Sequence, residues 1–366
     1  MAERNQFDRS RLLASLMQIP HGQLMAYVGP ALPAARAAPD QFAHLVAWNA
    51  KNGKVKDSQV AFPVLALRAL TKDDRDFAEN AVAHLCLLGP RELIRAYRFS
   101  KEITAYGRQA LHSQGKFIEL LALVGAENLD SLYKVPGGWR RLLEKGINLY
   151  LEYREERPAL WTRAVLSNHK AMKSLYAIAH RKPTRTVQRT LFERTYERGS
   201  VFDVVARLKG MGPREAAGMI LKHSIPFQIA VGAVAKAKDP DIVLALIEGM
   251  SGNELLNSTK MLEQFGVFDA PALRAAYGAA IGRAQSDKRA NTYRAAQAAA
   301  MVTDKQLAKK LATVQTAQEK TLGGIAGSWL ILGDKSGSMQ QSIEVAKHIA
   351  AAIGAQVKGS VLLTFF

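Results

Sequence analysis

The sequence predicts a mainly α-helical protein that continues into a short α/β segment. Three observations support this class. From about residue 40 to residue 315, one helical pattern follows another, separated by short Gly, Pro, Asn or Asp clusters. Almost no alternating β-branched run interrupts these patterns. After them come an apolar run of strand length, a polar loop and a further helical pattern, which is the order of a β-α unit.

The composition predicts a soluble protein of the cytoplasm with a polyanionic partner. With 366 residues the chain is long enough for two domains, and its net charge of +18 favours nucleic acid or an acidic membrane surface. We favour nucleic acid and no membrane contact, because no aromatic-rich basic anchor, signal core or membrane-length apolar stretch is found. The single Cys86 lies in an apolar run, which predicts a buried, inert thiol in a reducing compartment.

Residues 1–40 are predicted to form an extended N-terminal arm that lies over a neighbouring element. A short amphipathic pattern at residues 9–18 precedes four prolines, which oppose a long helix. The prolines are Pro20, Pro30, Pro33 and Pro39.

Residues 41–320 are predicted to be an array of helices. Gly-Pro and Asp-Pro signals, for example at residues 88–90 and 238–241, separate the helices. Helical pairs of this length without a strict period are typical of HEAT-like repeats, open or closed as a ring, with function on the exposed faces. The Ala-rich residues 287–310 are expected to form an exposed helix or helix pair. The glycines of residues 321–327 mark a domain boundary.

Residues 325–366 are predicted to be the first β-α-β part of an α/β domain. A buried strand begins at Trp329, a helix covers residues 343–353, and a second strand covers residues 361–366. The loop after the first strand carries one carboxylate and two hydroxyls at alternate positions, which are the hard oxygen donors that Mg²⁺ or Mn²⁺ prefers. The alternative is a serine-rich turn that caps a helix. The three candidate metal ligands are Asp334, Ser336 and Ser338.

Positive charge is concentrated between residues 134 and 209. Seventeen Lys and Arg residues stand there against seven Asp and Glu, an excess of ten, so more than half of the net charge lies in about a fifth of the chain. A helix predicted over residues 167–180 places its cations on one face and its apolar residues on another. Ordinary solvated helix faces would explain any one of these cations, but the cluster favours phosphate binding. The candidate RNA contacts are Lys170, Lys173, His180, Arg181, Lys182 and Arg185.

Two passages in this region resemble the TROVE-domain family, the ring-shaped RNA-binding proteins typified by the Ro autoantigen. The first is Gly-Trp-Arg-Arg-Leu-Leu-Glu-Lys-Gly-Ile-Asn-Leu-Tyr at residues 138–150, and the second is Met-Lys-Ser-Leu-Tyr-Ala-Ile-Ala-His-Arg-Lys-Pro at residues 172–183. In the second, Lys173, His180, Lys182 and Pro183 match the family motif. The leading His of the family motif is replaced by Met172 in this chain, and the internal Arg of the motif is replaced by Ala177. The order of a helical array and then a von Willebrand factor A-type domain is also that of the family.

The resemblance implies HEAT-like repeats that close into a ring. The hole of the ring would admit single-stranded RNA ends, and its outer surface would hold small structured non-coding RNA such as Y RNA. Such ribonucleoproteins act in non-coding RNA quality control and stress survival, some alongside an exoribonuclease. In the A-type domain, Asp334 would reach the metal through water and the two serines would bind it directly. The family's later Thr and Asp ligands are absent, so we expect weak metal binding or none, unless another chain completes a truncated domain.

The sequence is also compatible with a protein scaffold, and it offers little support for an enzyme. A HEAT-like scaffold that binds acidic proteins, with the A-type part as a docking module, predicts indifference to RNA. An enzyme is not expected, because no phosphate-binding glycine loop or metal-ligand spacing of histidines is found. The adjacent carboxylates at Glu155 and Glu156 point to different faces, which makes them a poor acid–base pair.

Overall fold

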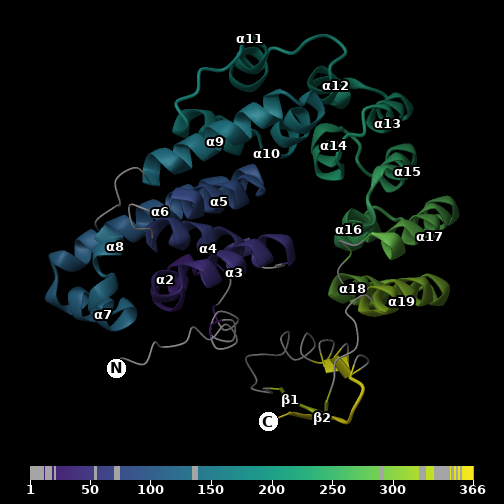
Figure 1. Ribbon diagram of the computed structural model, residues 1–366. Coiled ribbons are helices and arrows are strands. Elements are labelled where there is room, and N and C mark those ends of the chain that lie inside the picture. The colour runs from purple at the N-terminus through teal and green to yellow at the C-terminus, as the bar shows by residue number, and fades with distance from the viewer. Residues whose placement is uncertain are drawn as a thin grey trace. The chain divides into compact units, whose positions relative to one another are not determined.

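Helices make up most of the chain, which confirms the mainly α-helical class (Figure 1). The chain divides into two compact units, Met1–Thr195 and Tyr196–Phe366, here called unit 1 and unit 2, where the sequence analysis places no boundary. Within the described part of the chain, no helix is both long and apolar enough to cross a bilayer. The computed structural model describes residues 12, 19, 22–52, 56–69, 75–133, 139–287, 290, 292–320, 327–333, 347, 350–351, 353–354 and 357–365.

The helices of unit 1 begin and end at the turn signals of the sequence. The Gly89-Pro90 signal, for example, lies between α5 and α6, with Pro90 at the first helical position, where its missing N–H would have had no partner. The elements are η1 (Leu24–Tyr27), α2 (Val28–Ala37), α3 (Pro39–Asn52), α4 (Lys56–Ala69), α5 (Arg75–Cys86), α6 (Pro90–Leu111), α7 (Gln114–Val124), η2 (Ala126–Asn128), α8 (Asp130–Tyr133), α9 (Trp139–Glu155), α10 (Pro158–Ile178), α11 (Arg185–Val187) and η3 (Gln188–Glu193).

The core of unit 1 surrounds α4, which is buried along nearly its whole length and contacts α2, α3, α5 and α6. The buried Arg68 connects α4 to α6 and α8, because its guanidinium donates to the carbonyls of Ser100 and Leu132, the latter at 3.2 Å. Burial lowers the pKa of Arg68 to about 10, which leaves it charged at neutral pH. Backbone carbonyls therefore solvate a cation inside the core.

The prediction of an extended arm is wrong for residues 24–37 and 39–40, which are helical. Pro30 lies in the first turn of α2, where a missing N–H costs little, and Pro39 starts α3. Pro33 does remove one bond inside α2. Burial of apolar residues such as Val28 and Leu32 offsets that loss, since α2 packs on both α4 and α7.

Unit 2 continues the helical pattern around a second apolar core. The expectation of an exposed segment at residues 287–310 is wrong: a helix pair forms, but Ala295, Ala298 and Leu307 are buried in this core. Alanine allows the close approach that buries these helices. The helices are α12 (Val201–Arg207), η4 (Leu208–Gly210), α13 (Pro213–Lys222), α14 (Phe227–Ala233), α15 (Pro240–Gly249), α16 (Gly252–Gln264), α17 (Pro271–Ser286), α18 (Thr292–Met301) and α19 (Lys305–Lys320).

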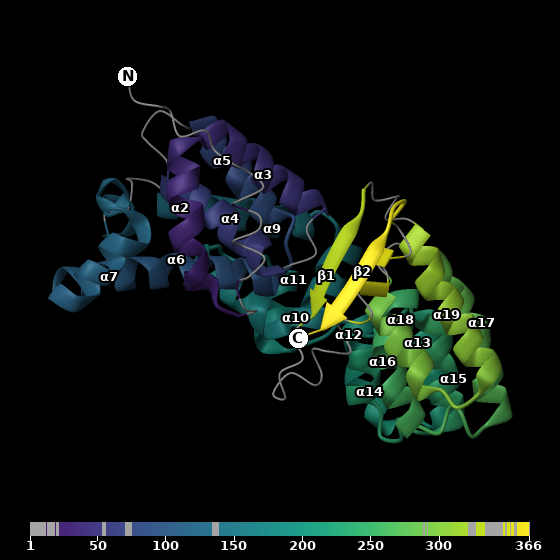
Figure 2. The ribbon, with the colours of Figure 1, turned by 90° about the horizontal axis from the view of Figure 1, so that it is seen from below.

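Two strands follow, as predicted. β1 (Trp329–Gly333) pairs in parallel with β2 (Val361–Phe365), with Trp329 opposite Val361, and residues 347, 350–351 and 353–354 between them are helical. Figure 2 shows the two strands side by side. The expectation of a buried first strand is wrong for its described side chains, because Trp329 and Leu330 are exposed. Parallel strands are normally covered on both faces, and no described element covers these side chains.

Candidate nucleic-acid interface

Helix α10, which carries the centre of the basic region, is interrupted at Asn168. This residue has φ −144° and ψ 43°, outside the helical range. The carbonyl of Ser167, the residue just before the interruption, accepts a hydrogen bond of 3.4 Å from the Arg91 guanidinium of α6. The predicted helix start at Ser167 is wrong, because α10 begins at Pro158, and the polar residues Ser167 and Asn168 instead mark a break within this helix.

The predicted division of faces after this break is confirmed. Met172, Leu175, Tyr176 and Ala179 are buried, as expected of the apolar stripe. On the opposite face, Lys170, Ala177 and His180 are exposed and Lys173 is half-buried. Side-chain spacing of 3.6 residues per turn is enough to produce this arrangement once one stripe is anchored in the core.

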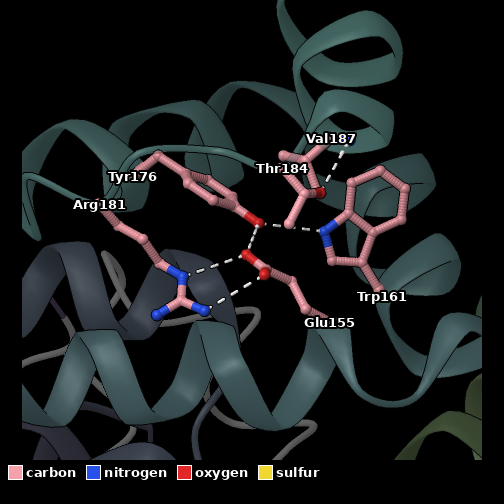
Figure 3. Close-up of polar contacts among 6 residues, drawn as sticks. All are labelled: Glu155, Trp161, Tyr176, Arg181, Thr184 and Val187. Atoms are coloured by element: carbon pink, nitrogen blue, oxygen red, sulfur yellow. Dashed lines mark hydrogen bonds and ion pairs between the residues drawn. The ribbon is translucent and has the colours of Figure 1, made fainter.

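Glu155, at the end of α9, holds the segment that follows α10 (Figure 3). Its carboxylate binds Arg181 through two 3.2 Å hydrogen bonds and accepts a 2.5 Å hydrogen bond from the Tyr176 hydroxyl. Trp161 Nε1 donates to the same hydroxyl at 3.4 Å. Burial and the bond to Glu155 raise the pKa of Tyr176, so the phenol stays protonated and donates. The cluster fixes the path of the chain beyond Tyr176.

The end of α10 is a Schellman turn with His180 at its left-handed position. The His180 backbone has φ +50°, and its N–H bonds to the Ala177 carbonyl at 3.3 Å, while the Arg181 N–H bonds to the Tyr176 carbonyl at 3.2 Å. Histidine tolerates this conformation better than β-branched residues do. The turn leaves the imidazole exposed and directs Arg181 toward Glu155.

The next turn positions Arg185. Thr184 caps α11 by accepting a hydrogen bond from the Val187 N–H at 3.4 Å, so Arg185 occupies the first helical position and is exposed. The π-helix η3 follows directly and ends at Glu193, and Arg194 after it has φ +56°. π-helical turns are rare in proteins, and those that occur are often found at functional sites.

Four of the predicted contacts are accessible to a phosphate, namely the exposed His180 and three cations. Lys170, Lys182 and Arg185 are exposed, and none makes an ion pair with any residue that the structure describes. Arg189 and Arg194 are exposed as well, and sequence reasoning left Arg194 out. The only available signal for Arg194 is its position in the basic region.

Two other predicted contacts are partly occupied by the protein itself. Arg181 is paired with Glu155, and the bond raises the pKa of Arg181. Lys173 Nζ lies 5.4 Å from the centre of the Phe192 ring, a cation–π contact between α10 and η3. Both side chains hold this surface together as well as contributing positive charge.

Sequence reasoning missed His169, which lies just after the break in α10. Its Nε2 atom is buried and has no hydrogen-bond partner among the described residues. Burial, Lys173 and Arg194 lower the pKa of His169, so the imidazole is neutral at physiological pH. Because the two cations cause part of this shift, an anion bound beside them would raise the pKa again.

The aromatic residues of the region are mostly structural. Trp161 and Tyr150 are buried in the core of unit 1. Tyr153 is half exposed, and the Arg157 guanidinium lies 3.9 Å from its ring centre. Tyr196, in unit 2, stacks on Phe202. Tyr153 is therefore the accessible candidate for stacking on an unpaired base.

The predicted metal ligands Asp334, Ser336 and Ser338 lie outside the described residues. Among the residues that are described, no group of three or more His, Cys, Asp or Glu side chains could hold a metal ion. Glu155 and Glu156 bind different partners, Glu156 pairing with Arg157 at 3.2 Å, as expected for carboxylates on different faces. Burial raises the pKa of Cys86 to about 11, so its thiol is a poor nucleophile.

Comparisons with protein-family models, curated proteins and solved structures each found no match to this chain.

Proposed function

We propose that this chain binds RNA through the basic surface of unit 1. The observation that carries the proposal is the exposure of Lys170, Lys182 and Arg185 without an ion pair among the described residues. They lie in a region with ten excess positive charges, where self-repulsion destabilises the folded chain. A bound phosphate backbone removes that repulsion and releases counterions.

The proposed ligand is a small structured non-coding RNA, Y RNA-like, with a single-stranded end. The likeness of residues 138–150 and 172–183 to the TROVE-domain family supports this class of RNA and the closure of HEAT-like repeats into a ring. The proposed role is non-coding RNA quality control or stress response in the cytoplasm. The chain acts there as part of a ribonucleoprotein, alongside an exoribonuclease or another RNA-processing protein.

The C-terminal part is proposed to belong to a von Willebrand factor A-type domain. The parallel pairing of β1 with β2 and the helical residues between them support a β-α-β unit. Asp334, Ser336 and Ser338 would offer one carboxylate and two hydroxyls to Mg²⁺ or Mn²⁺. We expect little thermal stabilisation when Mn²⁺ is titrated. A clear stabilisation that Asp334→Ala abolishes would show that these three ligands suffice.

The test of RNA binding compares a structured RNA that has a single-stranded 3′ tail with its blunt counterpart, at salt concentrations of about 50 and about 200 mM. Tighter, salt-sensitive binding of the tailed RNA is expected. If neither RNA binds at the lower salt concentration, the proposal fails.

A protein-interaction scaffold is the second candidate. An apolar cavity between α5 and α9, whose lining contains none of the exposed cations of α10 and α11, favours it. This function predicts a protein partner and no response to RNA.

A further inference from the structure

The imidazole of His169 lies against η3 and lacks a hydrogen-bond partner for one of its nitrogens. The Leu191 backbone of η3 is within hydrogen-bonding reach of the ring. Nε2, however, is buried and makes no hydrogen bond with any residue that the structure describes. In a protonated imidazole both nitrogens are donors. A charged His169 therefore needs an acceptor that the described part of the protein does not supply.

Two cations approach the same imidazole from two elements. Lys173 lies one turn after His169 in the regular part of α10, and its Nζ is 5.4 Å from the ring centre of Phe192 in η3. Arg194 directly follows η3, where the chain turns with φ +56°. Both cations act electrostatically on His169 and disfavour its protonation. The three basic side chains thus form one cluster at the junction of α10 and η3.

The elements that pack against α10 do not bring a carboxylate to this cluster. From α6, the cation Arg91 binds the carbonyl of Ser167, two residues before His169. From α9, the carboxylate of Glu155 is already bound to a guanidinium and a phenol. Glu193 of η3 is exposed and is not among the groups that shift the pKa of His169. The anion that would balance the cluster has to come from a ligand.

A phosphate group supplies both the charge and the acceptor. Its negative charge offsets the two cations, and one of its oxygens can accept a hydrogen bond from a protonated Nε2. Arg194 is exposed and His169 is partly exposed, so the cluster opens to solvent and a small shift of the ring brings Nε2 to the ligand. We propose that a phosphate of RNA binds between Lys173 and Arg194 and that His169 takes up a proton as it binds. This inference rests on the RNA binding proposed above and makes that binding dependent on pH.

The direction of the pH effect follows from linkage between protonation and binding. Without RNA, the pKa of His169 lies below its usual value of 6.5, because burial and the two cations disfavour the charged form. The bound phosphate raises this pKa. At a pH between the two values, binding takes up one proton, so affinity falls by up to about tenfold per pH unit as the pH rises. Below both values, or above both, affinity does not depend on His169.

The experiment measures binding of the tailed RNA by isothermal titration calorimetry, in buffers that differ in ionisation enthalpy but have equal ionic strength. The dependence of the binding enthalpy on the buffer gives the number of protons taken up. For the unmodified protein we expect net uptake, and an affinity that falls about three- to tenfold from about pH 6 to about pH 7. His169→Gln removes the titrating group and keeps a polar side chain. The control is His112→Gln, at an exposed histidine after α6 in the same unit.

His169→Gln should lose most of the proton uptake and of the pH dependence, whereas His112→Gln should keep both. Arg194→Gln, at an exposed position, should bind RNA more weakly and take up fewer protons; it replaces His169→Gln if that variant has a lowered melting temperature. Binding without proton uptake, or undiminished uptake by His169→Gln, overturns this inference and leaves RNA binding itself intact. The absence of RNA binding at every pH overturns both proposals.

Discussion

Neutralising two exposed lysines should flatten the salt dependence of RNA binding by a calculable amount. Lys170 and Lys182 are suited to this change because both are exposed and neither makes an ion pair with a described residue. Lys173 is less suitable, since its contact with Phe192 also holds α10 to η3. The double variant Lys170→Gln/Lys182→Gln therefore removes charge without opening the core.

The magnitude follows from counterion release. Each phosphate contact with a single strand contributes about −0.7 to the slope of log affinity against log salt, so two contacts contribute about −1.4. Over a fourfold change in salt, this corresponds to about a sevenfold change in affinity. From 50 to 200 mM salt, the unmodified protein should thus lose about sevenfold more affinity than the double variant.

The assay is fluorescence anisotropy with a labelled, tailed RNA across a salt series. The control is Lys222→Gln/Lys309→Gln, which removes the same charge from exposed positions of α13 and α19 in unit 2. The control should retain the full slope. An unchanged slope in the first variant, or an equal decrease in both, would show that net charge rather than the α10 surface attracts RNA.

Four further predictions concern the supports of this surface and the two cores. His180→Gly should raise the unfolding free energy, measured in urea, by about 0.5–1 kcal/mol, because glycine adopts positive φ without strain. The same variant should bind RNA more weakly in the anisotropy assay if the imidazole contacts RNA, and an unchanged affinity would remove His180 from the interface. Glu155→Ala should lower the unfolding free energy in urea by about 2–3 kcal/mol, because the Glu155 side chain is only 12% exposed and both Arg181 and Tyr176 lose their partner. A loss below about 0.5 kcal/mol would contradict this supporting role. Gly252→Ala should lower the unfolding free energy, measured by thermal unfolding, by about 3 kcal/mol, because an added Cβ would lie 2.3 Å from the backbone of α17. The control Gly282→Ala, where an added Cβ meets open space, should raise the unfolding free energy by up to about 1 kcal/mol, and equal effects of the two variants would refute the close contact. Cys86 should react with iodoacetamide at pH 8 about 100-fold more slowly than a thiol of pKa about 9. Its reaction rate should rise about tenfold per pH unit toward pH 11, and a rate that reaches a plateau near pH 8 would refute the raised pKa.

Local features of the sequence determined the helical class, several helix boundaries and the basic face of α10. Pro90 and Asp239-Pro240 mark helix starts because the constraints on proline and on capping residues act within a few residues. The buried and exposed faces after Asn168 follow from spacing alone, since a single turn sets which side chains share a face. The two strands were predictable from short apolar runs beside polar turns.

Contacts between residues distant in sequence decided the rest. The pairing of Arg181 with Glu155, 26 positions apart, converts a predicted RNA contact into a support of the surface, and no local pattern specifies a partner at that distance. The helical conformation of α2, despite Pro33, depends on burial against α4 and α7. The exposed Ile118 and Leu149 look like core residues in the sequence. Only the tertiary structure shows that they face water, because burial depends on which helices pack together rather than on the hydrophobicity of one residue.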